Sequence, residues 1–96
     1  MPYALSILRV EDYAKWKSAF DSKDGIALHK AFDMKSYLLF QTGEDHNNLV
    51  LLTEWDNLDK ARKFMQSEEL RVASQQSGVM GGPDNYFLEE VEKRSV

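Results

Sequence analysis

The sequence predicts an α+β domain in which helices cover one face of a four-stranded antiparallel sheet. Two observations lead to this prediction. The hydrophobic pattern alternates between the two-residue period of strands and the 3.6-residue period of helices, and the elements follow the order strand, helix, strand, strand, helix, strand. That order is the split βαβ arrangement of ferredoxin-like folds. A chain of 96 residues has room for one such domain, which we expect to span residues 1–96.

The first predicted strand and helix lie within the N-terminal third of the chain. Residues 3–10 are apolar, with Ser6 and Arg9 interspersed, as in a strand that is covered on at least one face. Asp12 is the expected N-cap of a helix whose apolar face repeats at helical spacing, with Tyr13, Trp16 and Phe20. This helix should fray or kink near Gly25, and residues 26–31 should add a further helical turn.

A hairpin is predicted next. Residues 35–41 and 49–55 both have the composition of strands, and the segment between them, TGEDHNN, consists of turn-forming residues. Two strand-like segments separated by such a turn are expected to pair as antiparallel neighbours.

The remaining residues predict a pair of short helices and a last strand. Asp56 is the expected N-cap of the first helix, and Ser67 should begin the second, which Gly78 ends. The apolar face of the first helix consists of Leu58, Ala61, Phe64 and Met65. The final strand is expected at residues 85–91.

The strand at residues 49–55 is apolar on both of its faces. Leu51 and Thr53 point to one side of the sheet, while Val50 and Leu52 point to the other. If one set packs on the helices, the other needs a second layer, and the chain has no elements left to supply it. We therefore expect a homodimer in which a second copy of the chain covers this face.

The charge balance and composition exclude several classes of partner. Twelve Lys and Arg residues are scattered among 16 Asp and Glu residues, giving a net charge of −4, so no basic surface for nucleic acid is predicted. No apolar run is long enough to cross a membrane, and the first residues contain neither a basic leader nor a cleavage site, so a cytoplasmic protein is expected. The chain contains no cysteine for a disulfide or a thiolate site.

Three segments of the sequence resemble a known superfamily. The segments LLTEW, DNLDKARKFMQSEELRVASQQSGV and PDNYFLEEVE are similar to the dimeric α/β-barrel superfamily, in particular to small antibiotic biosynthesis monooxygenase-like proteins, and the resemblance extends from Tyr3 to Glu92. It implies a homodimer whose two sheets pack face to face and enclose a pocket. Members of the superfamily oxidise polycyclic aromatic compounds without a cofactor, degrade haem or isomerise small acids, so the resemblance implies a fold more firmly than an activity.

The resemblance also implies a wall for the pocket. The counterpart of Trp55 lines the cavity in several oxygenase-like members, and the strand period then places Leu51 and Thr53 on the same wall. A similar alignment of the first strand turns Ala4, Ser6 and Leu8 inward. The simpler alternative is that Trp55 fills space in the core or in the dimer interface.

No cofactor is expected. Haem-degrading relatives carry an iron-ligating His on the helix after this strand, but this helix has Met65 and Gln66 near that position and no His. Cofactor-free relatives use an Asn, a Trp and an Arg around a flat phenolic substrate, and Asn48 begins the appropriate strand. Because Asn47 and Asn48 follow Gly43 in a turn-forming segment, a role in the hairpin turn is the favoured interpretation.

Two histidines are candidates for acid and base chemistry. His29 lies just before the second strand, and the resemblance implies a polar or basic residue there that faces the mouth of the barrel, where His29 would be a general base. A solvated or capping histidine at a helix end is the simpler interpretation. His46 lies in the hairpin loop and should be exposed. No metal site is expected, because neither His-x-x-x-His nor Glu-x-x-His spacing occurs.

Two functions remain open from the sequence. The first is a homodimeric barrel protein that encloses a small apolar or aromatic ligand without catalysing a reaction. The second is a cofactor-independent monooxygenase or cyclase-like enzyme that acts on an aromatic polyketide or quinol, with Trp55 shaping the pocket and His29 as the base.

Overall fold

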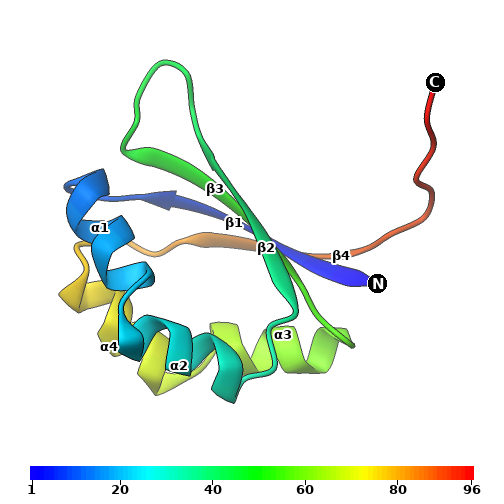
Figure 1. Ribbon diagram of the computed structural model, residues 1–96, viewed down its shortest axis with the longest axis horizontal. Helices are drawn as coiled ribbons and strands as arrows, with labels where there is room; N and C mark the ends of the chain where they lie inside the picture. Colours follow the sequence, from blue (N-terminus) through cyan, green and yellow to red (C-terminus); the bar gives the residue numbers. More distant parts are fainter.

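The computed structural model describes all 96 residues. It contains four strands and four helices, shown in Figure 1 in chain order: β1 (Pro2–Arg9), α1 (Tyr13–Phe20), α2 (Lys23–Ala31), β2 (Ser36–Gln41), β3 (Asn48–Glu54), α3 (Leu58–Met65), α4 (Glu68–Gln76) and β4 (Asp84–Glu89).

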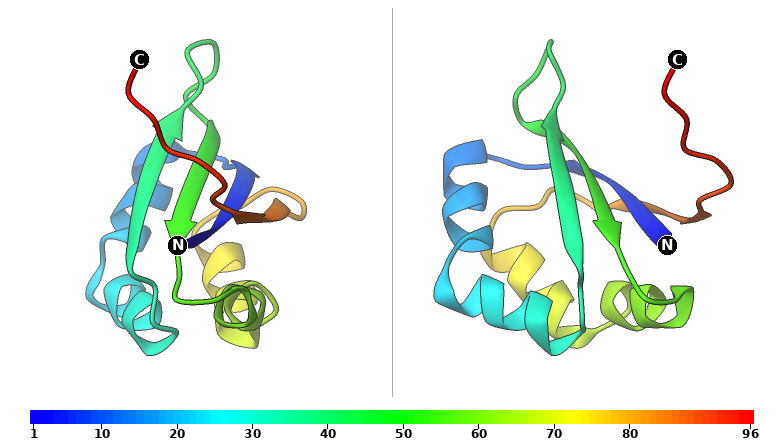
Figure 2. Two further views of the ribbon diagram at one scale, coloured as in Figure 1. Left: turned by 90° about the vertical axis from the view of Figure 1, so that its right-hand side faces the viewer. Right: turned by 45° about the vertical axis from the view of Figure 1, so that its right-hand side comes forward.

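The four strands form one antiparallel sheet in the order β2-β3-β1-β4. All four helices lie on the same side of this sheet, and residues 90–96 extend away from it after β4 (Figures 1 and 2). Strand β3 separates β1 from β2, which defines the split βαβ arrangement. The predicted α+β, ferredoxin-like fold is confirmed. No helix combines the length and the apolar character that crossing a bilayer requires.

Serine and aspartate caps define the helices between β1 and β2. The Asp12 carboxylate accepts a hydrogen bond from the Ala14 amide at 3.0 Å, as predicted for the start of α1. The Ser22 hydroxyl accepts from the Gly25 amide at 3.1 Å and begins a separate helix, α2. In place of the expected fraying near Gly25, the chain has a break between α1 and α2, and Ser22 caps α2.

Helix α3 begins one residue later than predicted. Its N-cap is Asn57, whose side chain accepts from the Lys60 amide at 2.9 Å. The Asp56 carboxylate lies instead 3.3 Å from the ammonium groups of both Lys35 and Lys60. The neighbouring asparagine takes the capping position. Ser67 caps α4 as predicted, accepting from the Leu70 amide at 3.1 Å.

The faces of β3 are opposite to those that the sequence suggested. Leu51, Thr53 and Trp55 were expected to line a pocket of the dimer barrel, but these three and Leu49 are at most 7% exposed in the single chain and pack under the helices. The alternative expectation for Trp55, that it fills space in the core, is confirmed. The indole nitrogen of Trp55 donates to the Thr53 hydroxyl at 2.8 Å, and the Trp55 ring packs on Phe64 of α3. These residues form the core of the monomer.

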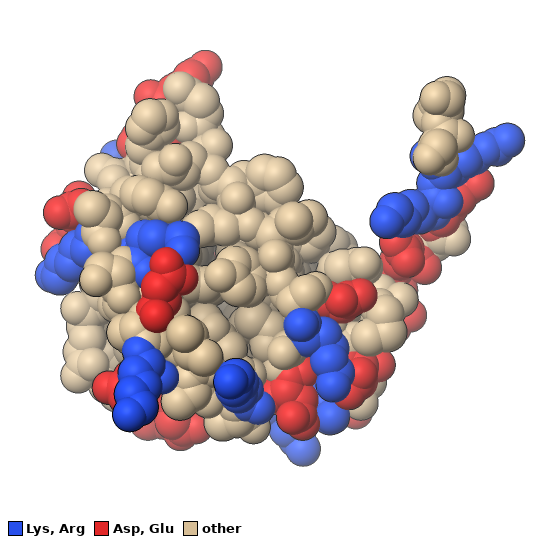
Figure 3. Space-filling model, in the orientation of Figure 1, with Lys and Arg blue, Asp and Glu red and all other residues tan.

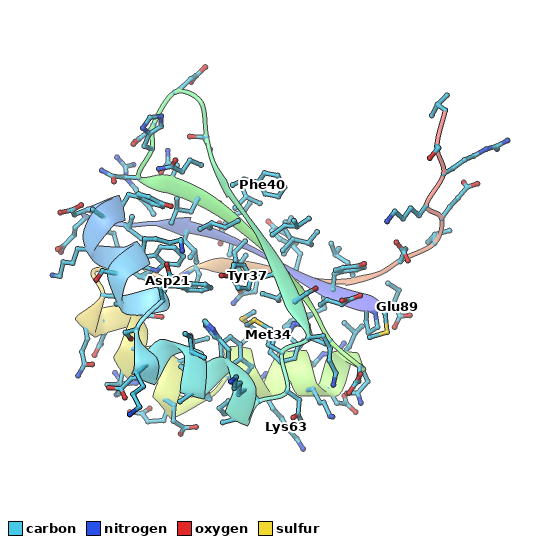
Figure 4. The ribbon with its side chains drawn as sticks, in the orientation of Figure 1. Asp21, Met34, Tyr37, Phe40, Lys63 and Glu89 are labelled. Carbon is cyan, nitrogen blue, oxygen red and sulfur yellow. The ribbon has the colours of Figure 1, made fainter.

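The side of the sheet that faces away from the helices is apolar and uncovered. Figure 4 shows Phe40 on this side. The strand pairing places nine apolar residues on the same side, which we call the open sheet face: Tyr3, Leu5, Ile7, Leu38, Phe40, Val50, Leu52, Tyr86 and Leu88.

Candidate ligand cavity between the sheet and the helices

A cavity with a volume of ≈ 100 Å³ lies between the sheet and the four helices. Twelve of its 19 lining residues are hydrophobic, and none is Lys, Arg, Asp or Glu. The cavity therefore suits an uncharged, apolar group, because burying an unpaired charge in a protein costs on the order of several kcal/mol.

Aromatic rings that pack on one another form the wall of the cavity on the side of α1 and α2. The rings of Trp16 and Phe20 stack with their centroids 4.8 Å apart. The centroid of the Phe20 ring lies 4.5 Å from that of the His29 imidazole and 5.1 Å from that of the Tyr37 ring of β2. Flat rings of this kind favour a flat aromatic ligand, which can stack on them or meet their edges.

His29 joins this wall through α2 and lines the cavity. Burial among the rings lowers the pKa of the His29 imidazole below its ordinary value of 6.5, and the Asp21 carboxylate opposes this shift only in part. The imidazole is therefore neutral at pH 7 and has a nitrogen that can accept a proton or a hydrogen bond.

A polar pair lies on the sheet side of the cavity. Ser6 of β1 and Asn85 of β4 are direct cross-strand partners. The Ser6 hydroxyl donates to the Asn85 side-chain oxygen at 2.7 Å, and the Met65 sulfur lies 3.9 Å from the same hydroxyl. Ser6 is 3% exposed and Asn85 is half-buried. The other polar side chains of the lining are His29, Ser74 and Ser77.

A second, more open hollow of ≈ 440 Å³ adjoins the cavity at the β2 edge of the sheet. Phe20, His29 and Met34 line both spaces and so form a shared wall between them. Figure 4 shows Asp21, Met34 and Tyr37 around the opening between α1, α2 and β2. In Figure 3, uncharged atoms occupy the centre of this side of the molecule and charged side chains lie around its rim.

The structure brings four of the six proposed site residues to the cavity. Ser6, Leu8, Leu51 and His29 all line it. Thr53 and Trp55 do not, because the Trp55 ring is fully buried against α3. The four residues line a cavity within one chain, on the helix side of the sheet, and not a space between two sheets.

Trp16 and Asn85 are among the cavity residues that the sequence did not predict. Trp16 was assigned only to the apolar face of a helix, but it is the tryptophan that lines the cavity. Asn85 lies on the same face of β4 as Phe87. Because asparagine is disfavoured in strands, an asparagine on the inner face of a strand is a sequence signal for a polar residue with a specific role.

Asn48 and His46 lie outside the cavity lining. Asn48 begins β3, and its side chain lies on the side of the sheet opposite to buried Leu49. Its backbone N–H donates to the Asp45 carbonyl in the hairpin turn at 3.0 Å. His46 is exposed in the loop. No three His, Cys, Asp or Glu side chains come together in a geometry suited to a metal ion.

Several solved structures share this arrangement of sheet and helices. A candidate antibiotic biosynthesis monooxygenase from Bordetella bronchiseptica aligns with a TM-score of 0.76 and 14% identity, over 95% of this chain and 97% of that one. A monooxygenase from the gene ActVA-Orf6 of Streptomyces coelicolor, in complex with nanaomycin D, aligns with a TM-score of 0.71 and 16% identity, over 99% and 91%. The chain has the fold of the antibiotic biosynthesis monooxygenases.

A third structure with this monooxygenase fold is SnoaB, a cofactor-independent oxygenase from Streptomyces nogalater. It aligns with a TM-score of 0.69 and 13% identity, over 96% of this chain and 94% of SnoaB. No family model matches the sequence, and no curated protein matches it. At such identities the likeness concerns the fold, while the chemistry of the cavity must be argued from its own residues.

Proposed function

We propose that this chain is a homodimeric α/β-barrel protein that binds a small aromatic ligand in the cavity between its sheet and its helices. The observation that supports the ligand is the cavity, which has no Lys, Arg, Asp or Glu in its lining, with its wall of packed aromatic rings. The nanaomycin D complex of ActVA-Orf6 supplies a precedent for a small ligand on this fold.

Size determines where the ligand lies. A dry cavity of about 150 Å³ accepts benzene, so a cavity of ≈ 100 Å³ does not hold two fused rings by itself. The adjoining hollow of ≈ 440 Å³ supplies the missing space if the side chains of Phe20, His29 and Met34 move apart. The ligand enters at the β2 edge and extends through this shared wall.

Tryptophan fluorescence tests the proposed cavity. Titration with 1,4-naphthoquinone should quench emission, and Trp16→Phe should remove most of the ligand-dependent change because Trp16 lines the cavity while Trp55 is sealed in the core. Trp55→Phe is the matched control and should keep the response. An absence of quenching at about 100 µM, where binding near −5.5 kcal/mol is already detectable, contradicts the ligand proposal.

A cofactor-independent monooxygenase is the second candidate function, and the position of His29 favours it. A neutral imidazole at the wall of the cavity can take the proton of a phenol, which makes the ring electron-rich enough to react with O₂. For 1-naphthol the balanced reaction with O₂ gives 1,4-naphthoquinone and water. One oxygen atom enters the ring and the other leaves as water, so O₂ is the only oxidant required.

Oxygen uptake with 1-naphthol tests the enzymatic candidate. His29→Phe keeps an aromatic ring in the wall but removes the base, and it should lower the rate by about 10² or more. His46→Phe, in the exposed hairpin loop, is the matched control and should leave the rate unchanged. Equal rates for the wild type and His29→Phe exclude His29 as the base. If 1-naphthol binds but no oxygen is consumed, the enzymatic candidate is excluded and only the ligand-binding function remains.

A further inference from the structure

We propose that Asn85, held in place by Ser6, determines ligand specificity by binding a neutral carbonyl or hydroxyl group on the buried end of an aromatic ligand. This inference rests on the proposed function, because it concerns the same cavity. It adds the chemical class of the group that the protein distinguishes and the residue that recognises it.

The sheet order places Asn85 far from the entrance. The outer hollow opens beside β2, at one edge of the sheet, while Asn85 is on β4 at the other edge. Three strand spacings of about 4.8 Å separate β2 from β4. A ligand that enters beside β2 therefore brings its leading end toward β4, past the His29 wall and under the helices.

The hydrogen bonds of the pair leave Asn85 with unused donors. A side-chain amide has one oxygen acceptor and two N–H donors. The oxygen accepts from the Ser6 hydroxyl at 2.7 Å, which fixes the plane of the amide and leaves its nitrogen for another partner. No side-chain polar atom of the protein is both fully buried and unpaired, so that nitrogen is accessible rather than sealed in the core.

A purely structural role explains the pair less well. Replacing both partners of such a hydrogen bond by apolar groups of similar shape is nearly neutral for stability, so packing alone does not require two polar residues here. An asparagine is also disfavoured in strands relative to β-branched and aromatic residues. A ligand that uses the free N–H group gives the pair a function that apolar residues cannot supply.

The cavity also limits the charge of the recognised group. An amide N–H can donate to a ketone or a phenol oxygen and donates more strongly to a carboxylate. The lining, however, contains no Lys or Arg to balance a buried anion. A carboxylate at the Asn85 end therefore pays its desolvation cost without a counter-charge. The structure favours a neutral oxygen over an anionic one.

Equilibrium dialysis against four bicyclic compounds tests this specificity. The compounds are naphthalene, 1-naphthol, 1,4-naphthoquinone and 2-naphthoate, and the chain has no cysteine that a quinone could modify. The wild type should bind 1-naphthol and 1,4-naphthoquinone about fivefold to tenfold more tightly than naphthalene, as expected for one net hydrogen bond. Binding of 2-naphthoate should be weaker than that of either neutral oxygen compound.

Three variants distinguish recognition from structure. Asn85→Leu should bind all three neutral compounds with similar affinity. Asn85→Asp should keep 1-naphthol, whose hydroxyl can donate to the carboxylate, and lose 1,4-naphthoquinone, which has only acceptors. In Ser6→Ala/Asn85→Leu the polar pair is removed completely, so this variant should fold with near wild-type stability and still lack the preference.

The control is Asn48→Leu, the same chemical change on the open side of β3, which should leave the preference intact. A wild-type preference that survives in both Asn85→Leu and the double variant overturns the inference, as does equal binding of naphthalene and its oxygen derivatives to the wild type. If none of the four compounds binds, the proposed ligand-binding function itself fails, so the two failures are distinguishable.

Discussion

His29 links burial to a dependence of stability on pH. Because the pKa of His29 is lowered by burial, the unfolded chain binds a proton at this residue more readily than the folded chain does. Between pH 6.5 and the lower folded pKa, the unfolded state therefore holds more protons at His29, and protonation favours unfolding. Above pH 6.5 the residue is neutral in both states and its effect disappears.

This sign gives a prediction for urea unfolding at pH 7.5 and pH 5.5. The free energy of unfolding of the wild type should fall as the pH decreases over this range, and His29→Phe should lose less over the same range because phenylalanine has no proton to bind. The replacement keeps a ring beside Phe20 and Phe64, so the comparison isolates the ionisation. Equal pH dependence in the two proteins contradicts the burial of His29.

Gly25 controls the contact between two helices at the scale of elements. It is the third residue of α2, and a Cβ atom there would overlap the carbonyl oxygens of Ala19 and Phe20 at the end of α1. Those oxygens belong to the backbone and cannot rotate away. Glycine at this position allows α1 and α2 to approach closely, and Gly25 also lines the cavity.

Gly25→Ala brings two effects into opposition. Alanine favours the helix by about 1 kcal/mol over glycine, whereas overpacking against rigid backbone typically costs about 1–3 kcal/mol. The clash should dominate, so urea unfolding should show a net loss of stability. Gly43→Ala is the control, since nothing lies within 4 Å of its Cβ position, and it should be neutral or stabilising by up to about 1 kcal/mol. A stabilised Gly25→Ala protein means that α1 and α2 are farther apart than described.

The existence of the strands and helices could be predicted because their signals are local. Residue periodicity and capping side chains such as Asp12 and Ser67 act within one turn of the chain. The start of α3 could not be predicted to the residue, since both Asp56 and Asn57 can cap a helix. In the structure Asp56 pairs with Lys35, which is distant in the sequence, and Asn57 takes the cap.

The faces of β3 show a second limit. A period of two separates Leu51 from Leu52 but does not say which of them meets the helices, because both sets are apolar. For the same reason, the sequence placed the expected pocket on the side of the sheet away from the helices, whereas the cavity lies on the helix side. Ser6 and His29 are candidate site residues in the sequence, but their meeting in one cavity depends on how the helices pack on the sheet, which no local pattern contains.

At the scale of the whole molecule, the open sheet face supports the proposed dimer. Several of its side chains are substantially exposed, including Leu38 at 57% and Phe40 at 50%. Nine apolar residues on one side of a small sheet form a patch of the kind that marks an interaction surface. A second copy that applies the same face by two-fold symmetry covers all of them, and stable interfaces of this kind bury about 1,200–2,000 Å² in total.

A matched pair of substitutions separates the dimer interface from the monomer core. Leu38→Asp places a carboxylate on the open sheet face, where the side chain contributes little to the single chain. It should therefore yield a folded protein with the monomer mass of 11.1 kDa. Leu51→Asp places the same carboxylate under the helices, where Leu51 is 7% exposed, and should unfold the chain because an unpaired buried charge costs several kcal/mol of a total stability of about 5–15 kcal/mol.

Light scattering after size exclusion, together with circular dichroism, measures both outcomes. The wild type should have twice the monomer mass of 11.1 kDa at micromolar concentration, and Leu38→Asp should have the monomer mass with an unchanged helical spectrum. A wild-type monomer contradicts the proposed dimer, while a Leu38→Asp dimer of undiminished affinity places the interface on another surface. Because the cavity lies within one chain on the far side of the sheet, the folded Leu38→Asp monomer should still bind 1,4-naphthoquinone, so the dimer and the ligand site can be tested independently.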